Sequence, residues 1–279
     1  KALRRYLGQF LGDQRVVELP RMLWLPLLHG IILRTRPKRS AAAYRKVWTD
    51  EGAPLPAYTA RQAEGLQQRM TAQHGADVTV TWGMRYGEPS VGAGLDELKA
   101  RGCDRILLFP MYPQYAGSTT GSLMDAVAAK MQGWRWVPAM RVVPPYYAHS
   151  AYLDALAASV RDDFAEHGAP DRLLLSFHGL PRAQVDAGDP YAQHCQCTAY
   201  GLAEQLGLKE ESWKQAYQSR FGPAEWLSPA TDATLQEWGE EGLGSVAVAC
   251  PGFPADCLET LEEIALGGRE TFEEAGGGH

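Results

Sequence analysis

The chain has 279 residues, 45% of them hydrophobic and 22% charged, and these globular proportions exclude a disordered or fibrous protein. The formal net charge is -6, and basic residues are scattered apart from one short run at residues 34–39, which argues against a general nucleic-acid surface. No segment approaches the roughly 20 uninterrupted apolar residues of a membrane-spanning helix, so we expect a chain that does not cross a bilayer.

Five cysteines are an odd number in a chain too long to depend on disulfides, which predicts a reducing, intracellular setting. The chain opens directly on an amphipathic helical pattern, so we expect that a piece of the amino terminus is missing. The apolar side of this pattern consists of Leu3, Tyr6, Leu7, Phe10 and Leu11.

A dense apolar stretch at residues 21–33 follows and leads into the basic run. A helix in the core, the lip of a ligand cleft and a membrane-surface contact all explain such a stretch. Its apolar residues are Leu23, Trp24, Leu25, Leu27, Leu28, Ile31, Ile32 and Leu33.

Beyond this stretch, short apolar runs alternate with helical periods, which is typical of βα units and a parallel sheet. We predict strands at residues 78–84, 105–110, 135–143, 172–177, 215–220 and 245–249. We predict helices at residues 90–101, 118–131, 151–167, 192–206, 231–240 and 255–265. The alternation breaks around Pro144 and Pro145, which predicts two α/β domains, at residues 1–144 and 145–279. Functional residues are expected in a cleft between these halves, just beyond the carboxyl ends of the strands.

The segment at residues 109–122 runs from a predicted strand through an aromatic loop to a hydroxyl-rich helix start. Tyr112 and Tyr115 offer flat surfaces suited to a planar aromatic ligand, with core packing as the competing interpretation. Ser118 and Thr119 lie where the start of the next helix can hold an anion. The segment lacks the Gly-Lys-Ser/Thr ending of a phosphate loop, which disfavours a nucleotide.

The predicted strand at residues 172–177 runs into His178 and is broken at once by Gly179 and Pro181. This pattern places His178 at the edge of the sheet where ligands bind. An imidazole can take a proton near neutrality or bind a borderline metal, and a structural role in capping the strand is the alternative.

Three of the acidic residues that follow the last predicted strand share a helical spacing. Asp256, Glu259 and Glu263 are spaced i, i+3 and i+7, which predicts three carboxylates on one helix face. Stacked like charges require a cation or a shared proton, so the pattern fits a cation path or proton ladder as well as a solvated acidic face.

The remaining candidate ligands are cysteines. Cys195 and Cys197 are one residue apart, but no second close pair completes the four ligands of a structural metal site. We interpret them as ordinary thiols, with an iron–sulfur cluster as the alternative.

Together these motifs resemble the ferrochelatase family, most of all its proteobacterial branch. The matching stretches, in order, are Arg-Tyr-Leu-Gly-Gln-Phe-Leu-Gly-Asp-Gln-Arg-Val-Val near the start, Tyr-Pro-Gln-Tyr with Ser-Thr-Thr-Gly-Ser, Ser-Phe-His-Gly-Leu-Pro, Gly-Asp-Pro-Tyr, Gln-Ser-Arg-Phe-Gly with Glu-Trp-Leu, and Pro-Gly-Phe followed by Asp-Cys-Leu-Glu-Thr-Leu-Glu-Glu-Ile. They cover nearly the whole chain.

The resemblance implies two flavodoxin-like or Rossmann-like halves around a porphyrin cleft, and an enzyme that inserts Fe²⁺ into protoporphyrin IX in the last step of haem biosynthesis. It implies that His178 and Glu259 face the porphyrin centre as catalytic and metal-binding residues. Glu263 and Asp256 would contribute secondary carboxylates.

The resemblance also implies a porphyrin pocket lined by Arg85 and Tyr86, with residues 21–33 as its lip, often next to a membrane. The expected porphyrin-binding set is Arg85, Tyr86, Tyr112, Tyr115, Ser118 and Thr119. We therefore expect a cytoplasmic protein, peripheral to the inner membrane, whose partners are protoporphyrin IX and ferrous iron, with no nucleic acid.

No tightly bound cofactor is expected, because iron is the substrate and no carboxy-terminal cysteine extension for an iron–sulfur cluster is visible. The family usually opens with a strand ending in a Leu-Gly-Thr-Pro-like loop and closes with a strand after the final Gly-Gly. Both are missing between Lys1 and His279, so a fragment is expected.

Metal insertion requires a base, oxygen or nitrogen ligands and an aromatic clamp. Neutral His178 is expected to accept a pyrrole proton or bind iron, with Glu259 opposite and Glu263 relaying charge away. A cobalt chelatase shares the architecture but tends to use two histidines, and Cys257 and Glu259 stand where one would be wanted. A porphyrin carrier would need the cleft but not the carboxylates. Coproporphyrin is the alternative substrate.

Overall fold

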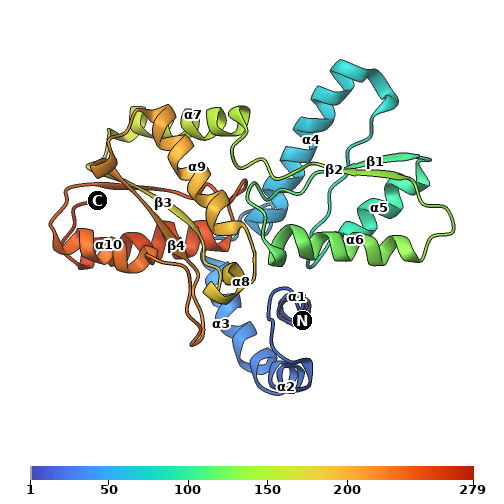
Figure 1. Cartoon of the computed structure of the whole chain (residues 1–279), viewed down its shortest axis with the longest axis horizontal. Helices are drawn as coiled ribbons and strands as arrows, with labels where there is room; N and C mark the ends of the chain where they lie inside the picture. Colours follow the sequence, from blue (N-terminus) through green and yellow to red (C-terminus); the bar gives the residue numbers. More distant parts are fainter. Residues whose placement is uncertain (1) are drawn as a thin grey trace. The chain divides into compact units, whose positions relative to one another are not determined.

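The computed structural model describes residues 2–279, and the chain divides into two compact units (Figure 1). The first consists of Lys1–Pro110 and Gly117–Val143, and the second of Met111–Ala116 and Pro144–His279. Met111–Ala116 belongs with the second unit because the buried Gln114 donates from Nε2 to Thr198 Oγ1 at 2.9 Å. This differs from the predicted division at residue 144, which places residues 111–116 in the first domain.

The first unit combines helices with a small parallel sheet. Its helical elements are α1 (Ala2–Gly12), α2 (Arg21–Leu27), the π-helical η1 (Leu28–Ile32), α3 (Leu33–Lys46), α4 (Pro54–His74), the 3-10 helix η2 (Gly75–Asp77), α5 (Val91–Ala100), the π-helical η3 (Gly117–Gly121) and α6 (Ser122–Gln132). Strands β1 (Arg105–Leu108) and β2 (Ala139–Val142) pair in parallel. Helices α5 and α6 lie along this sheet (Figure 1) and share a core with it, formed by Leu95, Ile106, Leu123 and Val127.

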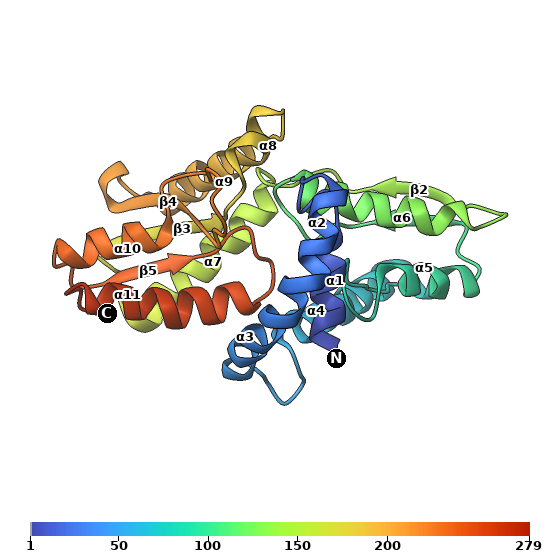
Figure 2. The ribbon, with the colours of Figure 1, turned by 90° about the horizontal axis from the view of Figure 1, so that it is seen from below.

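Helices α1 and α3 and η1 enclose a second apolar cluster at the start of the chain. It contains Leu7, Leu11, Leu28 and Leu33, and the apolar side predicted for the first helix is the side that supplies Leu7 and Leu11. Figure 2 shows α1 and α2 next to one another. Together they bring the apolar stretch at residues 21–33 against the first helix.

The strand predicted at residues 78–84 is wrong. Among the described residues its only ladder contact is an isolated bridge from Met84 to Ser90. The side chain of Gln67 on α4 supplies the hydrogen bonds instead: its Nε2 donates to Val78 O at 3.0 Å, and its Oε1 accepts from Val80 N at 2.6 Å. A strand exists only within a ladder, so an extended segment whose backbone is satisfied by a side chain does not become one.

The second unit contains a three-stranded parallel sheet in the order β4-β3-β5. The strands are β3 (Arg172–His178), β4 (Trp213–Gln218) and β5 (Val246–Ala249). The helical elements are α7 (Ser150–His167), α8 (Arg182–Asp186), α9 (Tyr191–Leu206), the 3-10 helix η4 (Glu210–Ser212), α10 (Thr231–Glu240), the π-helical η5 (Glu259–Gly268) and α11 (Arg269–Glu274).

Strand β3 lies at the centre of this sheet because its residues are apolar on both faces. Leu173 and Leu175 pack in the core that includes Leu202 of α9, whereas Leu174 packs with Trp238 of α10 and with α11. Successive side chains of a strand point to opposite faces, so one apolar run serves two helix layers. The predicted α/β class, with parallel sheets flanked by helices, is confirmed.

Two helix predictions differ from the structure in detail. The helix predicted at residues 118–131 begins as the π-helical η3 before α6, and the helix predicted at 255–265 begins only at Leu258 and continues as η5. Within the described residues, no helix combines the length and the apolar character needed to cross a bilayer.

Candidate active site

The candidate active site of the second unit lies at the carboxyl edge of its sheet. His178 ends β3 and stands opposite Gln218, which ends β4. Cys250 follows β5, the other neighbour of β3. Because the three strands are parallel, their ends deliver these residues to one edge, which is where ligands of such sheets bind.

The imidazole of His178 is held in one tautomer. Its Nδ1 lies 2.7 Å from the carbonyl oxygen of Gly179, and a carbonyl can only accept, so Nδ1 carries the hydrogen. The neutral ring therefore keeps its lone pair on Nε2. The ring is half-buried and lies 6.4 Å from the ring of Phe253, centre to centre. Nε2 is the atom of this ring that can accept a proton or bind a metal.

The residue after the histidine has to be glycine because the backbone passes close to β4. Gly179 N donates to Gln218 O at 2.7 Å. A Cβ at this position would lie 2.8 Å from the same oxygen and 3.1 Å from the ring of Trp226. The Gly179 that breaks the sequence pattern thus locks the end of β3 to the end of β4.

Glu263 on η5 is bound by the residue that follows β4. Its carboxylate accepts from the backbone N–H of Ser219 at 2.6 Å and from the Ser219 hydroxyl at 2.5 Å. Ser219 has a φ of 63°, and among residues 2–279 it alone combines a positive φ with a side chain. This left-handed conformation turns both donors towards the same carboxylate.

The protonation of Glu263 responds to three neighbours. Burial raises the pKa of this carboxyl above its usual range, and the hydrogen bonds from Ser219 oppose that rise. When it is protonated, His178 also lowers the pKa of Glu263, whereas the charge of Glu259 raises it. A carboxyl with a raised pKa takes up and releases a proton closer to neutral pH, which suits a proton relay.

Glu259 begins η5 and is positioned through its backbone. The side-chain amide of Gln218 donates from Nε2 to Glu259 O at 3.0 Å. In a π-helix the hydrogen bond runs from residue i to i+5, so a turn takes more than four residues. Glu259 and Glu263, four positions apart, therefore lie almost one above the other.

Asp256 does not join this helix face, so the predicted spacing of three stacked carboxylates is wrong. It is exposed and lies two residues before Leu258, where the helix begins. Its Oδ1 accepts from the hydroxyl of Thr260 at 2.8 Å. The predicted spacing assumed that the helix already included residue 256.

A buried polar network lies beneath the site. Gln218 is 3% exposed, and its Oε1 accepts from Ser176 Oγ at 2.7 Å and from Cys250 Sγ at 3.6 Å. Burial, together with the negative charges of Asp256 and Glu263, raises the pKa of the Cys250 thiol to about 12. The thiol therefore stays protonated and acts as a donor, so Gln218 is oriented by Ser176 of β3 and by Cys250, which follows β5.

In the first unit, Arg85 and Tyr86 are joined by Asp13. Arg85 pairs with Asp13 through Nη2, and the Tyr86 hydroxyl donates to Asp13 Oδ2 at 2.9 Å. The guanidinium lies over the Tyr86 ring, 4.4 Å from its centre. The structure thus brings the predicted pair together and adds Asp13 to it.

The other four predicted porphyrin-binding residues fall in both units. Tyr112 and Tyr115 lie in the loop that packs with the second unit, whereas Ser118 and Thr119 lie in η3 of the first. All four are half-buried. Tyr115 is fixed by its backbone N–H, which donates to His194 Nδ1 at 3.1 Å.

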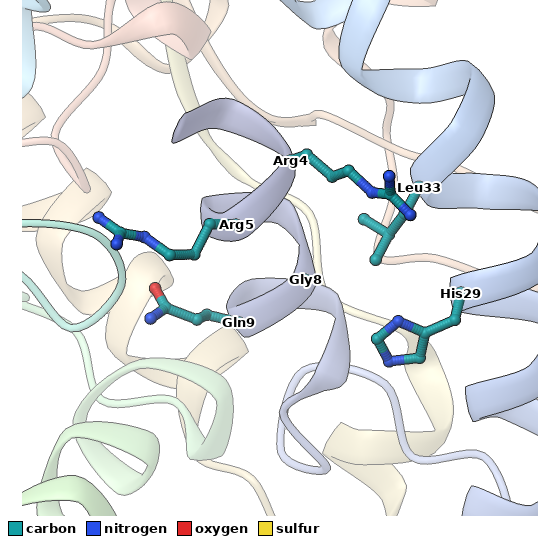
Figure 3. Close-up of a pocket in the computed structure, with 6 residues that line it drawn as sticks. All are labelled: Arg4, Arg5, Gly8, Gln9, His29 and Leu33. Atoms are coloured by element: carbon teal, nitrogen blue, oxygen red, sulfur yellow. The ribbon is translucent and has the colours of Figure 1, made fainter. Parts of the chain in front are cut away.

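An open depression of about 450 Å³ lies elsewhere in the first unit, beside α1 (Figure 3). Figure 3 shows Arg4 and Arg5 extending from α1, with His29 across from the helix. Its lining is Arg4, Arg5, Gly8, Gln9, His29 and Leu33. None of the residues predicted to bind porphyrin or metal belongs to it.

Neither the cysteines nor the acidic residues form a ready-made metal cage. Cys195 is buried and Cys197 is exposed, so their thiols point in different directions from α9. In the part of the chain that the structure describes, no group of three or more His, Cys, Asp or Glu side chains is placed to hold a metal ion.

Sequence reasoning missed Gln218, Ser219 and Asp13. The first two fell within a predicted strand at residues 215–220, whereas β4 ends at Gln218. Asp13 belongs to the Gly-Asp-Gln-Arg part of the first matching motif, which was the available signal for it.

The fold and this site define a class of protein: an α/β enzyme in which a histidine and helix-borne carboxylates at a sheet edge can exchange protons and contact a cation. Comparison with known proteins narrows the class. The ferrochelatase family model matches residues 1–279, and the chain belongs to the ferrochelatase family.

Its relatives have similar sequences along almost the entire chain. A ferrochelatase of Thioalkalivibrio sulfidiphilus is 55% identical over 280 residues, covering 100% of this chain and 75% of that protein. One of Azoarcus sp. is 56% identical over 278 residues, covering 99% and 76%. One of Methylococcus capsulatus is 50% identical over 277 residues, covering 99% and 83%.

Proposed function

We propose that this chain inserts ferrous iron into protoporphyrin IX, with His178 and Glu259 at the metal-insertion site. Its family membership makes it an enzyme that inserts iron into a porphyrin during haem biosynthesis. The choice of protoporphyrin IX and the roles of individual residues are the proposal. The observation that carries the proposal is the hydrogen bond from His178 Nδ1 to Gly179 O. This bond leaves the lone pair of the neutral ring on Nε2.

Insertion of Fe²⁺ breaks the two pyrrole N–H bonds of the porphyrin and releases two protons. The two freed nitrogens and the two unprotonated nitrogens then bind the iron. Neutral His178 accepts one proton on Nε2, a step within reach of an imidazole near pH 7. Glu259 meets the iron or accepts the second proton. Glu263, whose pKa is raised by burial, passes protons along η5 and away from the reacting nitrogens.

The proposed porphyrin-binding residues make two kinds of contact, one through charge and one through aromatic rings. Arg85 supplies a positive charge for a porphyrin carboxylate, and Tyr86, Tyr112 and Tyr115 supply aromatic rings. Ser118 and Thr119 offer hydroxyl donors. The proposal includes no resident cofactor and no iron–sulfur cluster.

Peripheral contact with the inner membrane from the cytoplasmic side is part of the proposal. On α2, Met22 is 89% exposed and Leu23 is 73% exposed, so their apolar side chains face solvent. The basic run on the following α3 is exposed too. An apolar helix edge beside positive charge suits the surface of a membrane that contains anionic lipids.

The test of the catalytic assignment is anaerobic incubation with Fe²⁺ and protoporphyrin IX, in which metalloporphyrin absorbance is followed for the parent chain and for His178→Ala. We expect kcat to fall at least about 100-fold, because the proton acceptor is lost. Porphyrin affinity, measured by quenching of porphyrin fluorescence, should stay within about twofold, because the ring is not a main binding surface.

His167→Ala is the matched control, since this exposed histidine lies at the end of α7. It should leave both rate and affinity unchanged. Loss of porphyrin binding together with turnover in His178→Ala would assign His178 a purely structural role. Binding without turnover in the parent chain would favour a porphyrin carrier.

A further inference from the structure

Asp13, which follows α1, is the centre of a nearly buried hydrogen-bond cluster in the first unit. Its side chain is only 10% exposed. Oδ2 accepts from Ser122 Oγ at 2.6 Å, from the Tyr86 hydroxyl at 2.9 Å and from Arg85 Nη2. Oδ1 accepts from the backbone N–H of Arg15 at 2.8 Å. One carboxylate therefore joins the connection between α1 and α2, the loop before α5 and the start of α6.

Arg85 is held by two partners and still has donors to offer. Its Nε donates to Ser122 O at 2.9 Å and to Ser122 Oγ at 2.7 Å, and its Nη2 pairs with Asp13. A guanidinium has five N–H donors, and within the described residues the Nη1 group of Arg85 makes no hydrogen bond. The side chain is 20% exposed, so Nη1 has a fixed direction before a ligand arrives.

The negative charge of Asp13 is what allows this arrangement. Burial by itself would raise the pKa of Asp13, but hydrogen bonds from Ser122, the Arg15 backbone and Tyr86, together with the charge of Arg85, outweigh it and lower the pKa. The carboxylate thus stays ionised. It balances the guanidinium charge in a poorly hydrated place, where an unpaired charge would be costly.

We propose that Asp13 is a positioning residue for porphyrin binding: it holds Arg85 and Tyr86 so that Arg85 Nη1 meets a carboxylate of the substrate. Asp13 does not touch the porphyrin itself. The inference rests on the proposed function, in which Arg85 and Tyr86 bind the porphyrin.

A neighbouring ion pair provides a matched control. Arg15 pairs with Asp125 of α6, with side chains 43% and 57% exposed. It ties the same connection to the same helix, and Asp125 makes no hydrogen bond to Arg85. Asp125→Asn therefore weakens the tether but leaves the Arg85 geometry intact.

The experiment measures protoporphyrin IX affinity by fluorescence quenching without iron, and then the KM values for porphyrin and for iron separately. Asp13→Asn should raise the porphyrin Kd and KM about tenfold, with kcat and the iron KM within about twofold. Asp125→Asn should behave as the parent chain does. Asp13→Glu, which restores the charge, should recover part of the affinity.

Coupling between the two residues separates positioning from general destabilisation. If Asp13 acts through Arg85, the variant carrying both Asp13→Asn and Arg85→Gln should bind porphyrin no more weakly than Arg85→Gln alone. If Asp13→Asn does not fold, the porphyrin Kd of Ser122→Ala provides the same test. It removes a donor to Asp13 and an acceptor of Arg85, and should raise the Kd in the same way.

Three results would overturn the inference: parent-like porphyrin affinity in Asp13→Asn, additive losses in the double variant, or an equal loss in Asp125→Asn. Absence of turnover in the parent chain would instead refute the proposed function. The binding measurement needs no iron and decides the role of Asp13 in either case.

Discussion

Ser219 shows at the scale of one residue how a strained backbone can prepare a carboxylate. A side chain at a φ of 63° costs roughly 1–2 kcal/mol relative to a right-handed conformation. The conformation persists because it brings two donors to Glu263. Hydrogen bonds to a charged group are stronger than neutral ones, which offsets the cost.

We predict that Ser219→Gly alters proton transfer but changes stability little. Glycine adopts this φ without strain and keeps the N–H donor, so the free energy of unfolding should change by less than about 1 kcal/mol. Loss of the hydroxyl removes a hydrogen bond that lowers the pKa of Glu263, so this pKa should rise further. A proton acceptor must be deprotonated, so the acid limb of the kcat profile should move to higher pH.

Urea unfolding and kcat measured across acid and neutral pH would check both effects. An unchanged acid limb would mean that Glu263 does not control turnover. A large loss of stability would mean that the hydroxyl is needed mainly for folding.

The position of His178 was predictable because an apolar strand broken by glycine and proline ends at a sheet edge. The supporting residues were not, since their roles depend on contacts between distant segments. Gln218 looks like a strand residue, and only the fold shows its amide reaching Glu259 O. Asp13 looks like a helix-ending residue until Arg85 is placed beside it.

At the scale of an element, η5 departs from its prediction in its helix type. Residue propensities do not distinguish a π-helix from an α-helix, so the spacing of Asp256, Glu259 and Glu263 suggested a regular α-helical face. In the structure Asp256 precedes the helix. Gln218 donates to the backbone carbonyl of Glu259, and Ser219 donates to the carboxylate of Glu263. The end of β4 therefore holds this helix in place.

The exposed apolar edge of α2 predicts membrane attachment. Met22→Glu combined with Leu23→Glu should lower the fraction bound to anionic lipid vesicles at least about tenfold, because charge replaces buried apolar area. Co-sedimentation would measure this, and the binding should weaken at high salt. Leu107→Glu is the control, because Leu107 is 66% exposed but belongs to β1, not to α2 or α3. Equal binding of the double variant would show that α2 is not the contact.

At the scale of the whole molecule, the pattern of apolar runs predicted the strands of the second unit better than those of the first. An uninterrupted apolar run has to be covered on both faces, so residues 172–177 identify a central strand such as β3. The prediction at residues 78–84 failed because pairing is a property of a sheet, and Gln67 satisfies that backbone instead.

The two-sided burial of β3 predicts which substitutions unfold the second unit. Leu174 has no exposed surface and packs with α10 and α11, so Leu174→Ala should lower the free energy of unfolding by about 2–5 kcal/mol. Urea unfolding would measure this. Leu266→Ala, at a side chain 48% exposed, should stay within about 0.5 kcal/mol. Similar losses in both variants would contradict a core centred on β3.

The central position of β3 also determines the order in which we expect parts of the site to unfold. Strand β3 is hydrogen-bonded on both sides, so we expect local fluctuations to open it last. Helix η5 is attached to the end of β4 by the side chain of Gln218 and by Ser219. We therefore expect η5, which carries Glu259 and Glu263, to detach on warming before β3 and His178 do. Heat inactivation should then begin with loss of the proposed proton relay, while the sheet is still intact.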